Sequence, residues 1–179
     1  MNSDPSSPPE QTEWPAAEAV SPLPETVVIE DWLTALHQQS NPHHKSSNGL
    51  SLGGQFTYPA SEMVGTTTDT NEADVAVQIR LRLQSQGMQL HLSGCLESTL
   101  PWVCDRCLAP LAITVSAQPD ETFLLLEHLP KAYQQEEWVT QYADDAEAFA
   151  PSDTFDLKDW VRQWVVLAAS GQHVCADCQ

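Results

Sequence analysis

Positive charge is the scarcest feature of this sequence. Its 179 residues include seven Lys and Arg against 25 Asp and Glu, which gives a formal net charge of −18 and a pI near 4.3. Affinity for nucleic acids depends largely on cations that neutralise phosphates, so this balance excludes a broad basic binding face. Only Arg80, Arg82 and Arg106 lie near one another in the sequence. We therefore expect direct nucleic-acid binding to be weak or absent, and a basic protein to be the more natural partner.

The sequence also lacks the segments that would direct it to a membrane. No apolar run near either end approaches the roughly 18 residues of a membrane-spanning helix. The first residues have neither the basic stretch nor the apolar core of a secretory signal. No Arg precedes Arg80, whereas transit peptides are rich in Arg. These absences predict a cytoplasmic protein without a membrane segment.

Sequence motifs of the common enzyme classes are missing as well. Gly53-Gly54 is not followed by the Lys-Ser/Thr pair of a phosphate-binding loop. The sequence contains no His-Glu-x-x-His, Gly-x-Ser-x-Gly or kinase motif. Acidic side chains are abundant, but the sequence marks no two of them as an acid–base pair. We therefore predict that the protein is not an enzyme.

Proline content and charge divide the chain into a tail and one domain. Residues 1–24 contain six prolines among Ser, Glu and Ala without apolar periodicity, which predicts a disordered, acidic, Pro-rich tail. Residues 25–179 are expected to form a single domain of ordinary size. It opens with an extended run at 26–29 and a helix at 32–39. Residues 60–72 are rich in Ser, Thr, Gly and Asn and are predicted to be a loop.

A two-residue periodicity predicts β-strands in the middle of the chain. In residues 75–83, five apolar side chains alternate with polar ones, and a second alternating run follows the candidate turn at 85–87. Further alternation occurs at 111–115 and in a short run at 122–127. The pattern predicts an antiparallel sheet with one polar face, curled toward a barrel. The expected fold class is α+β.

An amphipathic helix over residues 156–169 is predicted to pack on this sheet. Asp156 is its candidate N-cap, Phe155 and Trp160 have the spacing of a hydrophobic staple, and Gly171 follows as a left-handed stop. The two tryptophans of the helix are expected to be core residues rather than binding residues. The apolar stripe has helical spacing: Leu157, Trp160, Val161, Trp164, Val165 and Ala168.

Half of the excess negative charge lies in residues 118–156, which contain ten acids and one cation, Lys131. Trp138, Tyr142 and Phe149 interrupt the acidic runs. One interpretation is a solvated acidic loop. The other is an acidic surface with aromatic anchors that binds a basic protein.

Four of the five cysteines form two Cys-x-x-Cys pairs: Cys104 with Cys107, and Cys175 with Cys178. A two-residue spacer lets one turn direct two thiolates to the same point, and two facing turns would supply the four sulfurs of one structural zinc site. Free thiols without a metal are a second interpretation. A redox dithiol is a third, disfavoured because Leu108-Ala109-Pro110 follows the first pair where a helix is needed. The remaining Cys95 is expected to be a small buried side chain.

Several stretches occur in the order that one known family shows: Leu92-Ser93-Gly94-Cys95-Leu96, Val103-Cys104-Asp105-Arg106-Cys107-Leu108, an acidic interval, Phe155-Asp156-Leu157 at a helix start, and Cys175 with Cys178. Over roughly residues 75–178 the chain resembles the YceD family, the large ribosomal RNA subunit accumulation proteins. The resemblance implies a non-enzymatic role in large-subunit rRNA accumulation and ribosome assembly. YceD genes commonly neighbour the gene of a small basic large-subunit ribosomal protein, which implies such a protein as partner.

The residues alone leave two other functions open. One is a small zinc-binding adaptor unrelated to ribosomes, which a normal ribosome profile after deletion would favour. The other is a thiol oxidoreductase, which an insulin-reduction assay would reveal.

Overall fold

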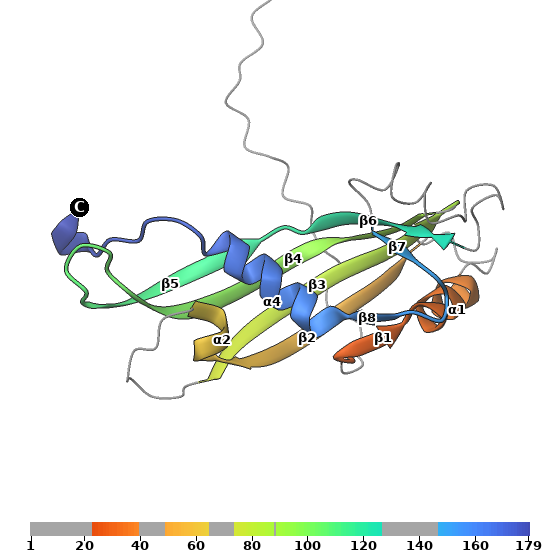
Figure 1. Cartoon of the computed structure of the whole chain (residues 1–179), viewed down its shortest axis with the longest axis horizontal. Coiled ribbons are helices and arrows are strands. Elements are labelled where there is room, and N and C mark those ends of the chain that lie inside the picture. Colours follow the sequence, from red (N-terminus) through yellow and green to blue (C-terminus); the bar gives the residue numbers. More distant parts are fainter. Residues whose placement is uncertain (1–22, 40–48, 65–73, 88, 127–146) are drawn as a thin grey trace, which may run out of the picture.

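The computed structural model describes residues 23–39, 49–64, 74–87, 89–126 and 147–179 (Figure 1). Nearly all of the predicted tail at 1–24 lies outside these residues. Trp138, Tyr142 and most of the acidic segment lie outside them as well. Within the described ranges, no helix has the length and apolar character needed to cross a membrane.

An open six-stranded sheet forms the centre of the fold. Its strand order is β2–β3–β4–β6–β7, and β5 pairs with β4 beyond the end of β6. Every pairing is antiparallel except the parallel pairing of β6 with β7. The α+β class with a mostly antiparallel sheet is confirmed. The strands are β2 (Leu50–Pro59), β3 (Asp74–Gln86), β4 (Gln89–Val103), β5 (Pro110–Ala117), β6 (Asp120–Leu125) and β7 (Ala148–Phe149).

The β3–β4 hairpin follows the predicted alternation. The five apolar side chains of residues 75–83 are at most 3 % exposed. They face the same way as Leu92 and Leu96 of β4, because Leu83 pairs with Leu92 and Ile79 with Leu96. Gly87 turns the chain with a φ of 63°, a value that glycine adopts without steric cost. Local periodicity therefore determined which face of the hairpin is buried.

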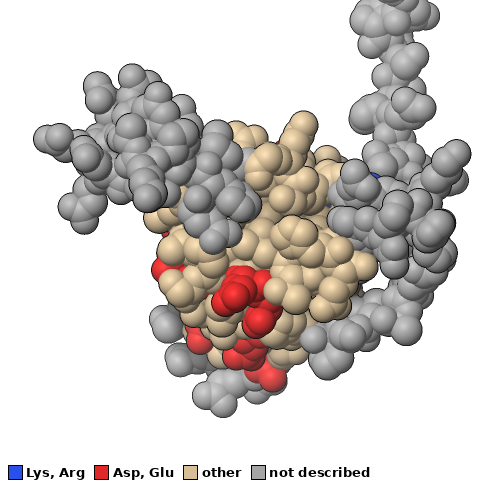
Figure 2. Space-filling model, turned by 90° about the vertical axis from the view of Figure 1, so that its right-hand side faces the viewer, with Lys and Arg blue, Asp and Glu red and all other residues tan. Residues whose placement is uncertain are grey.

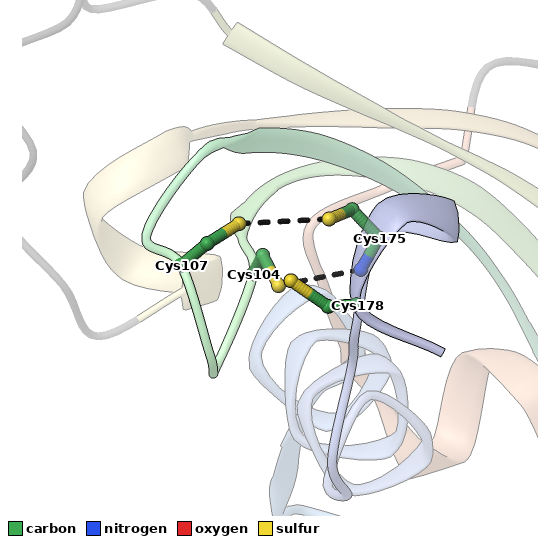
Figure 3. A group of neighbouring side chains, drawn as sticks. All are labelled: Cys104, Cys107, Cys175 and Cys178. Carbon is green, nitrogen blue, oxygen red and sulfur yellow. Dashed lines mark hydrogen bonds between the residues drawn. The ribbon is translucent and has the colours of Figure 1, made fainter.

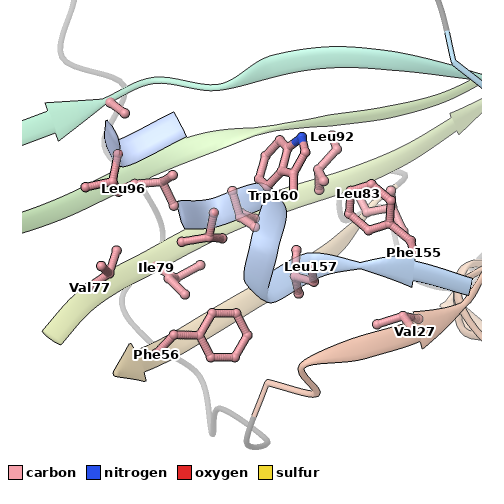
Figure 4. Packing of buried hydrophobic residues seen from close by; sticks show 14 of the residues in the cluster. Val27, Phe56, Val77, Ile79, Leu83, Leu92, Leu96, Phe155, Leu157 and Trp160 are labelled. Atoms are coloured by element: carbon pink, nitrogen blue, oxygen red, sulfur yellow. The ribbon is translucent and has the colours of Figure 1, made fainter. Parts of the chain in front are cut away.

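Three helices cover the apolar face of the sheet: α1 (Ile29–Gln39), α2 (Ala60–Val64) and α4 (Leu157–Ala168). Figure 1 shows α4 lying across the strands, and Figure 4 shows its Leu157 and Trp160 among the sheet residues Leu92 and Leu83. Leu157 and Leu92 are fully buried. The helix thus closes the core, as predicted from its apolar stripe.

The expectation of a barrel-like sheet was wrong. Among the described strands, β2 pairs only with β3, and β7 pairs only with β6, so the sheet has two separate edges. Barrel closure would bury the apolar face inside the sheet. Here the helices bury that face instead, and a separate two-stranded ribbon of β1 (Thr26–Val28) and β8 (Thr154–Asp156) lies beside them.

The N-terminal helix begins earlier than the sequence predicts, at Ile29. The N–H of Ile29 donates to the carbonyl of Asp153 at 3.0 Å, and the N–H of Glu30 donates to Pro151 at 2.9 Å. These tertiary acceptors satisfy the first turn without the predicted Asp31 cap. The loop predicted at 60–72 was also partly wrong, because it starts with the short helix α2.

The α4 helix begins as predicted and ends differently. The Asp156 carboxylate accepts the N–H of Asp159 at 2.8 Å, and the rings of Phe155 and Trp160 lie 6.1 Å apart as a staple requires. At the other end Ala169 caps the helix in a right-handed conformation. Gly171 has a φ of 151°, outside the left-handed helical region, so it is not the predicted stop.

A carboxylate beneath α4 holds both tryptophans of the helix. The indole N–H of Trp160 donates to one oxygen of Glu121 at 2.8 Å, and that of Trp164 donates to the other at 3.0 Å. Trp160 is buried and Trp164 half-buried against the core. The helix is therefore fixed to β6 by polar contacts as well as by packing.

Phe149 corrects the interpretation of the acidic segment. It was counted among the aromatic anchors, but it is 8 % exposed and its ring contacts those of Phe123 and Phe155 at 5.4 and 5.8 Å. Phe149 is thus a core residue that anchors the end of this segment to the sheet.

Candidate metal centre

The four paired cysteines meet at one end of the molecule. Cys104 directly follows β4, and Cys107 lies in the turn before β5. Cys175 and Cys178 flank the short 3-10 helix η3 (Ala176–Cys178) at the C-terminus. Figure 1 shows η3 beside the β4–β5 turn, beyond the end of α4. Segments nearly 70 positions apart are thereby brought together.

Backbone hydrogen bonds shape the first cysteine turn. The N–H of Leu108 donates to the carbonyl of Cys104, and the N–H of Cys104 donates to Ala109, both at 2.9 Å. Leu108 has a φ of 59°, and it is the one non-glycine residue with a positive φ in the described part of the chain. This conformation costs an L-residue about 1–2 kcal/mol. The turn that directs both thiols inward therefore contains local strain.

The two residues inside the first pair hold the C-terminal segment. The N–H of Asp105 donates to the carbonyl of His173 at 2.9 Å, and the Asp105 carboxylate accepts the N–H of His173 at 2.5 Å. The Arg106 guanidinium donates to the carbonyl of Cys178. The analysis of cysteine spacing missed these two roles. The only signal in the sequence was an Asp-Arg pair inside a tight turn.

His173 connects the cysteine cluster to the rest of the fold. Its ring packs edge-on against Trp102 of β4, with 5.1 Å between the ring centroids. Its Nε2 lies 2.9 Å from the carbonyl of Ala169 at the end of α4. The segment after α4 is thus held between the helix and β4 before it reaches the cysteines.

The sulfur atoms form a compact group. All four Sγ atoms lie within 4.8 Å of one another, and those of Cys107 and Cys175 are 3.5 Å apart (Figure 3). Around a zinc ion with bonds of about 2.3 Å, tetrahedral geometry places neighbouring sulfurs about 3.8 Å apart. A disulfide would bring two of them to about 2.0 Å. The observed spacing is therefore that of a metal cluster, and these four side chains could hold one ion.

Hydrogen bonds to the sulfurs perturb the thiols in opposite directions. The N–H of Cys175 donates to Sγ of Cys104 at 3.3 Å. This bond, with the N–H groups of Cys107 and Arg106, lowers the pKa of the Cys104 thiol to about 6. The pKa of Cys178 is raised to about 12, mainly by its contact with the thiol of Cys107. A bound cation would offset the repulsion that opposes ionisation of several crowded thiols.

The neighbouring stretch on β4 contains Gly94 and Cys95. A Cβ atom on Gly94 would lie 2.1 Å from the carbonyl oxygen of Arg80 and 2.8 Å from Cα of Leu81, so only glycine fits between these strands. Cys95 was expected to be buried, and this was wrong. It is half-buried on the polar face of the sheet, with its sulfur 3.9 Å from the carboxylate of Glu97.

Comparison with protein families places the cysteine cluster in a known context. Residues 92–179 match the family model described as large ribosomal RNA subunit accumulation protein YceD. Over these residues the chain belongs to the YceD family. No entry among the curated proteins and none among the solved structures matches it. The resemblance expected from the cysteine turn and the helix start is thus confirmed.

The YceD match covers the whole candidate metal centre. It begins at Leu92 within β4 and includes all four clustered cysteines, Gly94, and α4. The first part of the fold, from β1 to β3, precedes the matched residues. The family pattern therefore coincides with the strands that carry the first cysteine turn and with the helix that leads to the second.

Proposed function

We propose that this protein is a non-enzymatic assembly factor that supports large-subunit rRNA accumulation by binding a basic protein of the large ribosomal subunit. The match to the YceD family carries the ribosomal part of the proposal. The charge of the chain supports the choice of a basic protein, rather than naked RNA, as the direct partner.

Few cations are available for phosphate contacts in the described part of the chain. It contains fourteen Asp and Glu but five Lys and Arg. Three of the five are already in ion pairs with carboxylates: Arg80 with Glu97 at 3.2 Å, Lys158 with Glu25 at 2.6 Å, and Arg162 with Asp159 at 2.7 Å. A fourth, Arg106, contacts the backbone of Cys178. Direct neutralisation of RNA phosphates would have to disrupt these contacts.

Acidic side chains are exposed at the end of the molecule opposite the cysteines. Glu30 and Asp31 lie in the first turn of α1, beside the loop of Pro151 and Asp153. Figure 2 looks onto this end, where Asp and Glu atoms form groups in the middle and lower part of the face and almost no Lys or Arg is visible. Such a surface would attract a basic partner over about 8 Å at physiological ionic strength.

We also propose that the cysteine cluster holds one structural zinc ion. A set of four cysteines leaves no open coordination position for a substrate, which is typical of structural rather than catalytic zinc. In this role Cys104 and Cys107 would supply two thiolates from the sheet, and Cys175 and Cys178 would supply two from the C-terminus. The metal would contribute folding energy by joining these segments.

The oxidoreductase alternative receives less support from the same geometry. Thiols of thioredoxin-type enzymes are activated at the N-terminus of a helix. Here β5 follows Cys107 after two intervening residues, and Cys178 ends η3 rather than preceding a helix. The cluster is built between a strand end and the chain terminus, which suits a structural role.

The experiment that tests the partner is a binding titration with purified basic proteins of the large ribosomal subunit, each assayed singly by biolayer interferometry. We expect one of them to bind, with an affinity that falls as salt rises. Reversal of Glu136, Glu137, Asp144 and Asp145 to Lys should slow association about tenfold or more, because surface charge acts mainly on the encounter rate. These four acids lie outside the described residues.

A matched control carries the same change in charge elsewhere. Reversal of Asp4, Glu10, Glu13 and Glu18 in the N-terminal tail alters the net charge equally and should affect association much less. The proposal fails if the wild-type protein binds naked rRNA tightly at physiological salt but binds no basic ribosomal protein. It also fails if both charge reversals have the same effect.

A further inference from the structure

The β4–β5 arm extends past the rest of the sheet. We define it as residues 99–114, which comprise the end of β4, the cysteine turn and the start of β5. The pairing of β3 with β4 stops at Val77 and Ser98, so beyond that point β4 pairs with β5 alone. A two-stranded hairpin is only marginally stable by itself. The cysteine cluster at its tip joins the arm to the C-terminal segment.

The two faces of this arm differ in character. Its inner face contributes Leu100 and Ile113 to the buried core, and Trp102 and Leu111 pack partly against it. Its outer face consists of uncharged residues, all exposed except the half-buried Val103: Thr99, Pro101, Val103, Pro110, Ala112 and Thr114. In a chain with a net charge of −18, such an uncharged strip is unusual and favours contact with another macromolecule.

Leu108 stands at the tip of the arm. It is 73 % exposed, the highest value among the large apolar side chains of the described residues. Its φ of 59° is unfavourable for leucine and natural for glycine. Exposure and strain both disfavour leucine here in the isolated protein. A residue that is unfavourable in two ways at a rigid turn is evidence for a role in binding.

The charges around the tip indicate the chemistry of the partner. Asp105 and Asp177 are exposed on either side of the cysteine cluster. The one cation of the turn, Arg106, is directed to the carbonyl of Cys178. An apolar tip flanked by carboxylates is complementary to an apolar pocket that is flanked by Lys or Arg.

We propose that the outer face of the β4–β5 arm, with Leu108 as its apolar anchor, is the surface on which the basic ribosomal protein docks. This inference rests on the proposed function and adds the place of contact. The metal centre would then orient the docking arm, because its cysteines begin one residue after β4 enters the turn and end at the C-terminus. The acidic segment would speed the encounter, and Leu108 would slow dissociation.

The test compares Leu108 with an equally exposed leucine. Leu167 on α4 is 63 % exposed and lies outside the arm, so Leu167→Ala is the matched control. The probe is the purified ribosomal protein that binds the wild-type chain in the titration described above. Leu108→Ala should raise Kd about tenfold or more, chiefly through a faster dissociation rate, with unchanged zinc content. Leu167→Ala should leave Kd unchanged.

Leu108→Gly separates binding from folding. Glycine removes the strain at a positive φ, so this variant should have a Tm equal to or above that of the wild type and still lose affinity. Hydrogen exchange on the wild-type complex gives a second measurement that needs no variant. Amides of residues 99–114 should be protected by the partner, and those of α1 should not.

The outcomes distinguish the two proposals. Absence of binding by the wild-type chain to every basic protein tested overturns the proposed function. Binding that Leu108→Ala and Leu108→Gly leave intact, or a complex without protection of residues 99–114, overturns the docking site alone. Loss of self-association or of naked rRNA binding in the Leu108 variants, with ribosomal protein binding unchanged, would assign the arm to a different occupant.

Discussion

Replacement of Cys104 by serine tests the metal centre most directly. Cys104 is the fully buried member of the cluster, and its sulfur accepts the N–H of Cys175. Serine keeps the size of the side chain approximately but removes a thiolate ligand. We expect the wild-type protein, purified without a metal-binding tag, to contain about one zinc ion per chain. Cys104→Ser should reduce that content.

The effect on stability can be worked out from the separation of the linked segments. A metal bridge between Cys107 and Cys175 closes a loop of 68 residues. If it restricts the unfolded chain as a disulfide would, it stabilises the fold by about 4 kcal/mol. For a protein of this size that corresponds to a decrease in Tm of roughly 10 °C when the bridge is lost. The hydrogen bonds of Asp105 and Arg106 to the C-terminal segment remain, so this is an upper figure.

The assay combines elemental analysis with thermal unfolding, followed by circular dichroism with and without a chelator. Cys95→Ser is the matched control, since Cys95 is a free cysteine on β4 outside the cluster. The control should keep both its zinc and its chelator-sensitive Tm. Cys104→Ser should unfold at the same temperature as the chelated wild type.

Two results would refute this reasoning. One is a wild-type protein that contains no zinc and whose Tm does not change on addition of zinc or chelator. The other is an equal effect of Cys104→Ser and Cys95→Ser, which would mean that the loss comes from packing rather than from the metal.

Two further substitutions test the strand contact and the helix anchor. Gly94→Ala places a methyl group 2.1 Å from the carbonyl oxygen of Arg80, so β3 and β4 must separate; it should lower the free energy of unfolding by about 1–3 kcal/mol in urea, whereas Ser93→Ala on the exposed face should have little effect, and equal midpoints would contradict the close approach. Glu121→Ala removes the acceptor of both indole N–H groups and should lower the free energy of unfolding by about 1–3 kcal/mol with a change in tryptophan fluorescence, while an unchanged Tm would show that the carboxylate does not hold α4.

The features that could be predicted from the sequence are those encoded by local spacing. Alternation in residues 75–83 determined the buried face of β3, since side chains of a strand point to opposite faces in turn. The apolar stripe and Asp156 determined α4 and its first turn. The two-residue spacer of each cysteine pair indicated that both pairs would face a common point, and their sulfurs are indeed close together.

Tertiary structure alone decided the features that depend on distant partners. Whether the sheet closes depends on its edge strands, and no local pattern encodes whether β2 meets another strand. The start of α1 is set by the carbonyls of Asp153 and Pro151, and Phe149 is buried because it meets Phe123 and Phe155. Such contacts join residues far apart in the chain, so their energies do not appear in any short window of sequence.

The cysteine turn contains both kinds of information. Its spacing is local, but the positive φ of Leu108 and the roles of Asp105 and Arg106 arise only when the C-terminal segment docks 68 to 72 residues away. Side chains within two residues of one another can therefore be predicted as ligands from their spacing. The groups that position them are determined by packing, because hydrogen-bond partners are chosen by distance in space rather than by distance along the chain.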